Sequence, residues 1–96
     1  MPTRLWIALP DGVHNTCGLE ILSGDKNLVI RFEKLCVDKL MRGEVSKKLG
    51  TFFQGGHDNK TWKYFEFLCG SHHCDLILKL AMEIADELEL DLEIGE

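Results

Sequence analysis

The segment Cys69-Gly70-Ser71-His72-His73-Cys74 concentrates thiol and imidazole groups in one short stretch of the chain. Zinc prefers thiolate and imidazole ligands, usually four of them in a tetrahedron. The segment holds four candidate ligands: Cys69, His72, His73 and Cys74. His57 or Cys17 would supply a further ligand from elsewhere in the chain. Because no second pair of such residues has the spacing of a structural zinc site, we expect no cofactor, with zinc at this segment as the alternative.

A thiol-dependent site is a second interpretation of the same segment. Ser71 is a good helix N-cap, and Cys74 would then lie in the first turn, where the helix dipole stabilises a thiolate. However, consecutive helix residues point in different directions, so neither histidine obviously faces Cys74, and no Cys-x-x-Cys motif is present. A small buried Cys69 and two exposed histidines also explain the segment.

Other catalytic arrangements find little support in the residue spacing. Ser71 and Asp75 lie one turn apart, but the sequence places no histidine between them to relay a proton. Gly55-Gly56 lacks the spacing of a phosphate-binding loop. We therefore expect a non-enzymatic interaction or accessory protein, with the metal- or thiol-dependent module at Cys69–Cys74 as the alternative.

The net charge of −5 is concentrated at the C-terminal end of the chain. Every charged residue after Lys79 is acidic: Glu83, Asp86, Glu87, Glu89, Asp91, Glu93 and Glu96. Nonspecific nucleic-acid binding needs a basic stripe, and the basic residues do not cluster beyond Lys47-Lys48, so we expect no direct binding to nucleic acid. We expect three of the acids to face solvent on a final edge strand: Glu89, Asp91 and Glu93. There they would face a basic protein partner, mimic nucleic acid, or only keep the protein in solution.

The composition is that of one small globular domain spanning residues 1–96. Hydrophobic residues make up 45% and charged residues 28%, which argues against disorder. No apolar run approaches the roughly 18 residues that a membrane span needs, and the N-terminus lacks the apolar core of a signal peptide. Four cysteines without the spacing of a disulfide framework are typical of a reducing compartment. We therefore expect a cytoplasmic protein that does not bind membranes.

The first third of the sequence predicts strands. An apolar run over residues 3–9 ends at the turn Pro10-Asp11-Gly12. Apolar and polar residues then alternate over residues 16–22 and again over residues 28–33, on either side of Ser23-Gly24-Asp25-Lys26. Two segments of period two around a turn containing glycine predict an antiparallel hairpin.

The remaining segments predict two helices and three strands. Apolar residues at helical spacing over 37–49, followed by Gly50, predict a first helix. Residues 51–54 and 61–69 predict a second hairpin. The amphipathic pattern behind Ser71 predicts a second helix, and residues 90–94 predict a last strand, with an extension of that helix as the alternative. The expected order βββαββαβ gives an α+β fold, a mostly antiparallel sheet with both helices packed on one face.

The second hairpin holds most of the aromatic residues, and its longer strand is apolar on both faces. Trp62, Tyr64 and Leu68 fall on one face, and Phe65, Phe67 and Cys69 on the other. Two helices on the same side of the sheet can cover only one of these sets. We therefore expect Trp62, Tyr64 and Phe53 to line a surface for self-association, giving a homodimer, or a ligand groove. A sheet that curls enough to bury both faces is the alternative.

Overall fold

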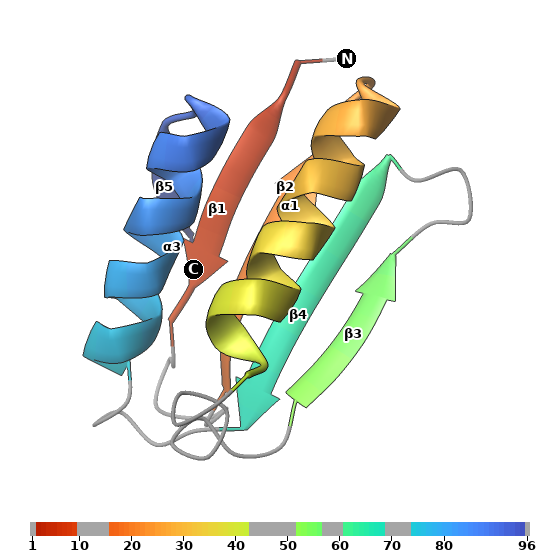
Figure 1. The fold of residues 1–96 in the computed structure, drawn as a ribbon. Coiled ribbons are helices and arrows are strands. Elements are labelled where there is room, and N and C mark those ends of the chain that lie inside the picture. The colour runs from red at the N-terminus through yellow and green to blue at the C-terminus, as the bar shows by residue number, and fades with distance from the viewer. Residues whose placement is uncertain (1, 10–15, 43–51, 57–60, 69–73, 96) are drawn as a thin grey trace.

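The chain folds as an α+β protein in which one sheet carries two helices (Figure 1). The computed structural model describes residues 2–9, 16–42, 52–56, 61–68 and 74–95, with the backbone alone for residues 52–54, 68 and 74. The described elements follow in this order: β1 (Arg4–Ala8), β2 (Thr16–Leu22), α1 (Lys26–Leu40), β3 (Phe52–Gly56), β4 (Trp62–Leu68), α3 (Cys74–Leu88) and β5 (Leu92–Gly95). The predicted class is confirmed, and neither described helix is long and apolar enough to cross a membrane.

The sheet is mixed, with the strand order β3-β4-β2-β1-β5. β1 pairs with β5 in parallel, whereas the pairs β1–β2, β2–β4 and β3–β4 are antiparallel. Two connections contain a helix: β2-α1-β3 and β4-α3-β5. Their first strands, β2 and β4, are antiparallel to each other, and the two connections cross the sheet toward opposite edges. Since such crossovers are almost always right-handed, the same hand places both helices on the same face, as Figure 1 shows.

Residues 28–33 form part of a helix, and the predicted strand there is wrong. Asp25, which the sequence assigned to a hairpin turn, is the N-cap of α1: its side chain accepts hydrogen bonds from the backbone N–H groups of Asn27 and Leu28, at 3.0 and 3.3 Å. The buried residues of α1 recur every three or four positions, at Val29, Phe32, Cys36 and Leu40. The short alternation over residues 28–33 carries apolar side chains in both phases, so it fits a helix as well as a strand.

The helix predicted over residues 37–49 agrees with α1 only over residues 37–40 and is wrong at Met41 and Arg42, which lie past the end of that helix. α1 already starts at Lys26 and ends at Leu40, with Met41 as its C-cap. The part of the prediction that covers residues 43–49, together with Gly50, lies outside the described residues.

The end of α3 determines how the acidic C-terminal segment folds. Glu89 adopts a left-handed backbone conformation with φ 57°. The N–H of Glu89 then donates to the carbonyl of Asp86 at 3.1 Å, and the N–H of Leu90 to that of Ala85 at 2.9 Å. This is the pattern of a Schellman motif, which ends the helix. A final strand is confirmed as β5, but it begins at Leu92 rather than at the predicted Leu90. Only Glu93 of the three expected outward acids belongs to it, because Glu89 lies in the cap and Asp91 before the strand.

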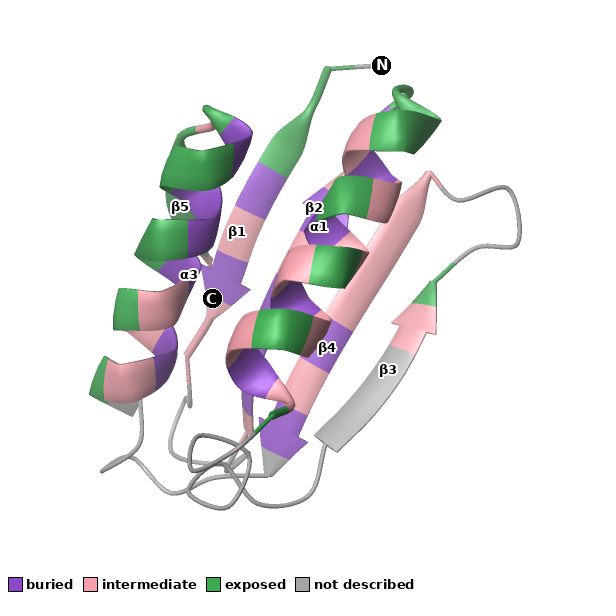
Figure 2. Cartoon of the chain, viewed as in Figure 1, coloured by how far each residue is buried: buried purple, intermediate pink, exposed green. Residues whose placement is uncertain are grey.

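The hydrophobic core lies between the sheet and the two helices (Figure 2). Alternate residues of β1, β2 and β4 point toward the helices, and one side of each helix meets them. The largest fully buried side chains are Phe32, Phe65, Phe67, Leu5, Ile7, Leu19, Ile21, Leu40, Ile77, Ile84 and Val29. The rings of Phe32 and Phe65 pack at 5.9 Å between centroids, which joins α1 to the middle of the sheet. α1 and α3 thus cover one face of the sheet.

Candidate functional site

The opposite face of the sheet, here called the outer face, carries the side chains that alternate with the core residues. Trp6 of β1 is directly paired with Glu20 of β2, and Glu20 with Tyr64 of β4. Trp62 lies on this face two residues before Tyr64, whereas Phe65 is buried toward the helices. The expected division of the two faces of β4 is therefore observed for the described side chains, whereas Cys69 and the side chain of Leu68 lie outside them. Neither described helix covers the outer face (Figure 1).

Glu20 joins the two tryptophans of the chain. The indole N–H of Trp6 donates to Glu20 Oε2 at 3.1 Å, and the indole N–H of Trp62 donates to Glu20 Oε1 at 3.1 Å. Each carboxylate oxygen therefore accepts one indole, which holds both rings on the outer face across three strands. Hydrogen bonds to an ionised acceptor are among the stronger ones in proteins.

Tyr64 completes an aromatic wall with Trp62. The two ring centroids are 5.1 Å apart and the planes are inclined by 38°, within the range of favourable aromatic pairs. The Tyr64 ring lies across Gly55 of the neighbouring strand β3, at a point where a Cβ atom would overlap the ring. Phe53, the third predicted member of this surface, is paired with Glu66 in the backbone register, and its side chain is outside the described residues.

Arg4 lies on the outer face beside Trp6 and Glu93. Its guanidinium lies 4.9 Å from the centre of the Trp6 ring. It also donates from Nε to Glu93 Oε2 at 3.2 Å and from Nη2 to Glu93 Oε1 at 3.4 Å. Glu93 is thus engaged within the chain, and since both side chains are about half exposed, the ion pair contributes little to stability.

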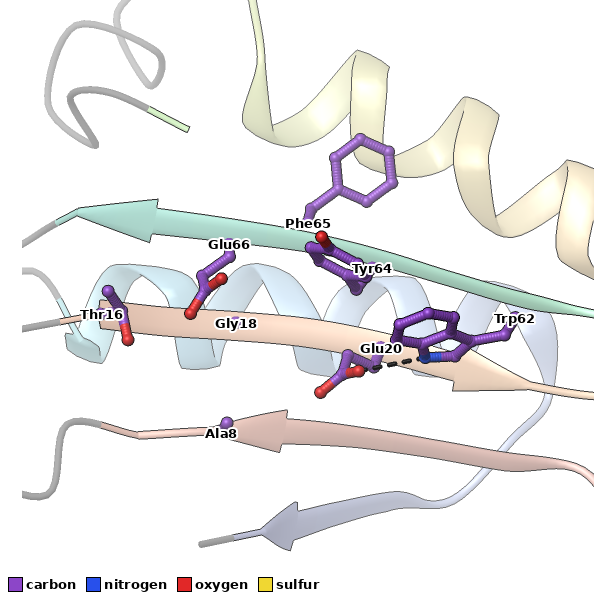
Figure 3. A pocket seen from close by; sticks show the side chains of 8 residues that line it. All are labelled: Ala8, Thr16, Gly18, Glu20, Trp62, Tyr64, Phe65 and Glu66. Atoms are coloured by element: carbon purple, nitrogen blue, oxygen red, sulfur yellow. Dashed lines mark hydrogen bonds between the residues drawn. The ribbon is translucent and has the colours of Figure 1, made fainter. Parts of the chain in front are cut away.

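A hollow of about 230 Å³ opens on the outer face between the aromatic wall and two carboxylates (Figure 3). Its lining residues come from β1, β2 and β4: Ala8, Thr16, Gly18, Glu20, Trp62, Tyr64, Phe65 and Glu66. Figure 3 shows Glu66 and Glu20 on either side of Gly18. Glu20 already accepts the two indoles, whereas Glu66 makes no hydrogen bond or ion pair with another described residue.

The predicted metal or thiol segment is not tested by the described residues. Cys69, His72 and His73 lie outside them, as does His57, and only the backbone of Cys74 is described, at the start of α3. Within the described part of the chain, no three residues of suitable type come together to hold a metal ion. Cys17 lies fully buried in the core beneath the helices.

Cys36 is the other described thiol, and it also lies in the core, on α1. Burial raises the pKa of this thiol well above its ordinary value, and the nearby charge of Glu33 adds to the effect. The thiol therefore stays protonated at neutral pH, and a protonated thiol is a poor nucleophile.

The three acids expected to form an acidic surface at the C-terminal end do not share one strand. Glu89, Asp91 and Glu93 are all exposed, but they lie in the cap of α3, in the connection before β5 and in β5 itself. Next to them, Met82 and Ile94 are the large apolar side chains most open to solvent among the described residues, at 55% and 65% exposed. They line a second hollow between α3 and β5.

The chain was compared with known protein families, curated proteins and solved structures. No family model, curated protein or solved structure matches the chain. The side chains of the outer face therefore have to indicate the function by themselves.

Sequence reasoning missed Trp6, Glu20 and Glu66 as members of this site. Trp6 and Glu20 stand at outward positions of their predicted strands, so the alternation could have marked them. The order β4-β2-β1, which brings Glu20 between the two tryptophans, carries no local signal in the sequence.

Proposed function

We propose that this protein is a non-enzymatic binding module that holds a basic protein partner against the outer face of its sheet. The observation that carries the proposal is the pair Trp6 and Trp62, fixed on one carboxylate on a face that neither described helix covers. Tryptophan and tyrosine dominate the energetic centres of protein interfaces. Side chains that are already fixed lose little conformational entropy when a partner binds.

The charges of the outer face favour a basic partner. Among the described residues, three carboxylates lie on this face, at Glu20, Glu66 and Glu93, against the single guanidinium of Arg4, which is already paired with Glu93. A basic partner would find complementary charge here, and such complementarity speeds association and selects partners. Two copies of the chain placed face to face would instead bring Glu20 and Glu66 of each copy toward like charges.

Self-association through the same face is the competing form of this function. The sequence predicts it from Trp62 and Tyr64, and it stays a prediction that the experiment below decides. We expect binding to take place in the cytoplasm, because the cysteine spacing is typical of a reducing compartment.

Intrinsic fluorescence tests the proposal directly, since the chain has two tryptophans and both lie on the outer face. The wild type is titrated with a lysine- and arginine-rich peptide and, separately, with a glutamate-rich peptide of equal length. We expect the basic peptide alone to shift the tryptophan emission, and we expect a Tyr64→Ala variant to bind it more weakly. Glu83→Gln, on the exposed side of α3, is the matched control and should bind as the wild type does.

Two results would overturn the proposal. The first is tryptophan emission that stays unchanged with the basic peptide, or changes equally with the acidic one. The second is a stable dimer in sedimentation that the Trp62→Ala variant splits without unfolding, because a second copy would then occupy the face.

A further inference from the structure

We propose that the hollow beside Gly18 binds one cationic group, the ammonium of a lysine or the guanidinium of an arginine from the partner. This inference rests on the proposed function and names the chemical group that the outer face recognises. It follows from three features of the hollow, namely its carboxylates, its aromatic wall and its size.

The carboxylates supply the charge. Glu66 borders the hollow and makes no hydrogen bond or ion pair with another described residue. It is half-buried, so a bound cation would interact with it under less solvent screening than at an exposed position. Glu20 borders the hollow from the other side of Gly18. Each of its oxygens accepts one indole, and a carboxylate oxygen has a second lone pair for another donor.

The aromatic wall supplies the second contact. The rings of Trp62 and Tyr64 line the hollow (Figure 3), and aromatic faces attract ammonium and guanidinium groups. Both rings are held before any ligand arrives, Trp62 by its hydrogen bond to Glu20 and Tyr64 by packing on Trp62 and across Gly55. A cation that enters the hollow therefore meets rings and carboxylates that are already in place.

The size of the hollow suits the charged end of one side chain better than a whole small molecule. Gly18 and Ala8, two of the smallest residues, contribute to its lining. Its volume of about 230 Å³ is below the range of roughly 300–1,000 Å³ typical of pockets for whole small molecules and cofactors. A Cβ atom at position 18 would stand 3.5 Å from the carbonyl oxygen of Phe65 and 3.9 Å from Cγ of Glu66. These are ordinary contacts, so Gly18→Ala should fold while placing a methyl group against Glu66.

Nuclear magnetic resonance with small probes tests the inference. The probes are Nα-acetyl-lysine amide and Nα-acetyl-arginine amide, and the matched neutral control is Nα,Nε-diacetyl-lysine amide. The readout is the indole N–H signal of Trp62, which lines the hollow, with the backbone N–H signal of the exposed Glu83 on α3 as an internal reference. We expect at least one of the charged probes to shift the Trp62 signal in a saturable manner and the neutral probe to leave it unchanged.

Variants locate the cation. Loss of a charge-assisted hydrogen bond is expected to weaken binding of the charged probe about tenfold or more in Glu66→Gln. Gly18→Ala should weaken it as well, because the methyl group occupies space beside Glu66. Glu83→Gln, outside the hollow, should bind the probe as the wild type does. Thermal melting of each variant shows that it is folded.

The outcomes separate this inference from the proposed function. If the basic peptide binds the outer face but neither charged probe shifts the Trp62 signal, the cation site is wrong and the binding module stands. Equal shifts with the neutral probe, or unchanged binding in folded Glu66→Gln and Gly18→Ala, also overturn the cation site. If neither the basic peptide nor the probes bind, both proposals fail.

Discussion

The ring of Tyr64 lies across Gly55, at the place where any other residue would carry its Cβ atom. Gly55 and Tyr64 are directly paired between β3 and β4. The absence of a side chain on one strand thus makes room for a large ring on the next. Glycine in a strand interior often marks such a close approach.

Gly55→Ala should therefore displace the Tyr64 ring from the outer face. We expect a loss of about 1–3 kcal/mol in the free energy of unfolding, as for other overpacked sites, together with weaker binding of the basic peptide. Denaturant unfolding and the fluorescence titration measure the two effects. Gly18→Ala is the matched control for stability, since its added Cβ meets only ordinary contacts. A Gly55→Ala protein with unchanged stability and an unchanged Trp62 environment would contradict the ring placement.

Glu20→Gln should loosen both tryptophans. A carboxylate can accept from two indoles, whereas an amide offers one oxygen and turns an N–H group toward the second indole. We expect a loss of about 1 kcal/mol, at the low end of the cost of a donor left without its acceptor, because both indoles are only partly buried. The measurements are the free energy of unfolding and the quenching of tryptophan emission by acrylamide, which should increase. Should quenching and stability both match those of Glu83→Gln, the double hydrogen bond would be refuted.

Cys36 should make the stability of the fold depend on alkaline pH. Its pKa is raised in the folded state from an ordinary value of 9.0 by burial and by Glu33. Below pH 9.0 the thiol is protonated in both states, so it contributes no pH dependence there. Above pH 9.0 the unfolded thiol ionises while the folded one does not, and the free energy of unfolding falls by about 1.4 kcal/mol per pH unit from this group.

A comparison of wild type with Cys36→Ala isolates that contribution. The difference in their stability should be constant at neutral pH and shrink as the pH rises above 9.0. Urea denaturation across this range measures it. A difference that stays constant up to pH 11 would mean that the thiol is not sealed in the core.

Glu89→Gly should stabilise the protein. Glu89 has φ 57° in the Schellman motif that ends α3, a conformation that glycine adopts without strain. We expect a gain of about 0.5–1 kcal/mol, measured by denaturant unfolding. Glu83→Gly, in the middle of the same helix, is the matched control and should lose about 1 kcal/mol. A loss of stability in Glu89→Gly would contradict the assigned cap.

The elements that the sequence predicts correctly are those with an unambiguous hydrophobic period. Strand alternation over residues 16–22, the two-faced apolar strand at Trp62–Leu68 and the helical spacing from Ile77 to Leu88 all predict what is observed. These patterns are local, because the burial of one face sets the period of each element. Residues 28–33 show the limit of such patterns. Apolar side chains occur at both odd and even positions there, so the segment fits a helix as well as a strand, and it lies in the helix that Asp25 caps.

The candidate site, in contrast, depends on contacts between strands that are far apart in the chain. That Trp62 and Tyr64 share a face follows from their spacing, but the contact of Trp6, Glu20 and Trp62 depends on three strands that are distant in the chain. Pairing between such strands is set by the packing of the whole sheet against α1 and α3, and by the hand of the two crossovers. No local segment contains that information. The carboxylate between two indoles therefore exists only once β2 lies between β1 and β4.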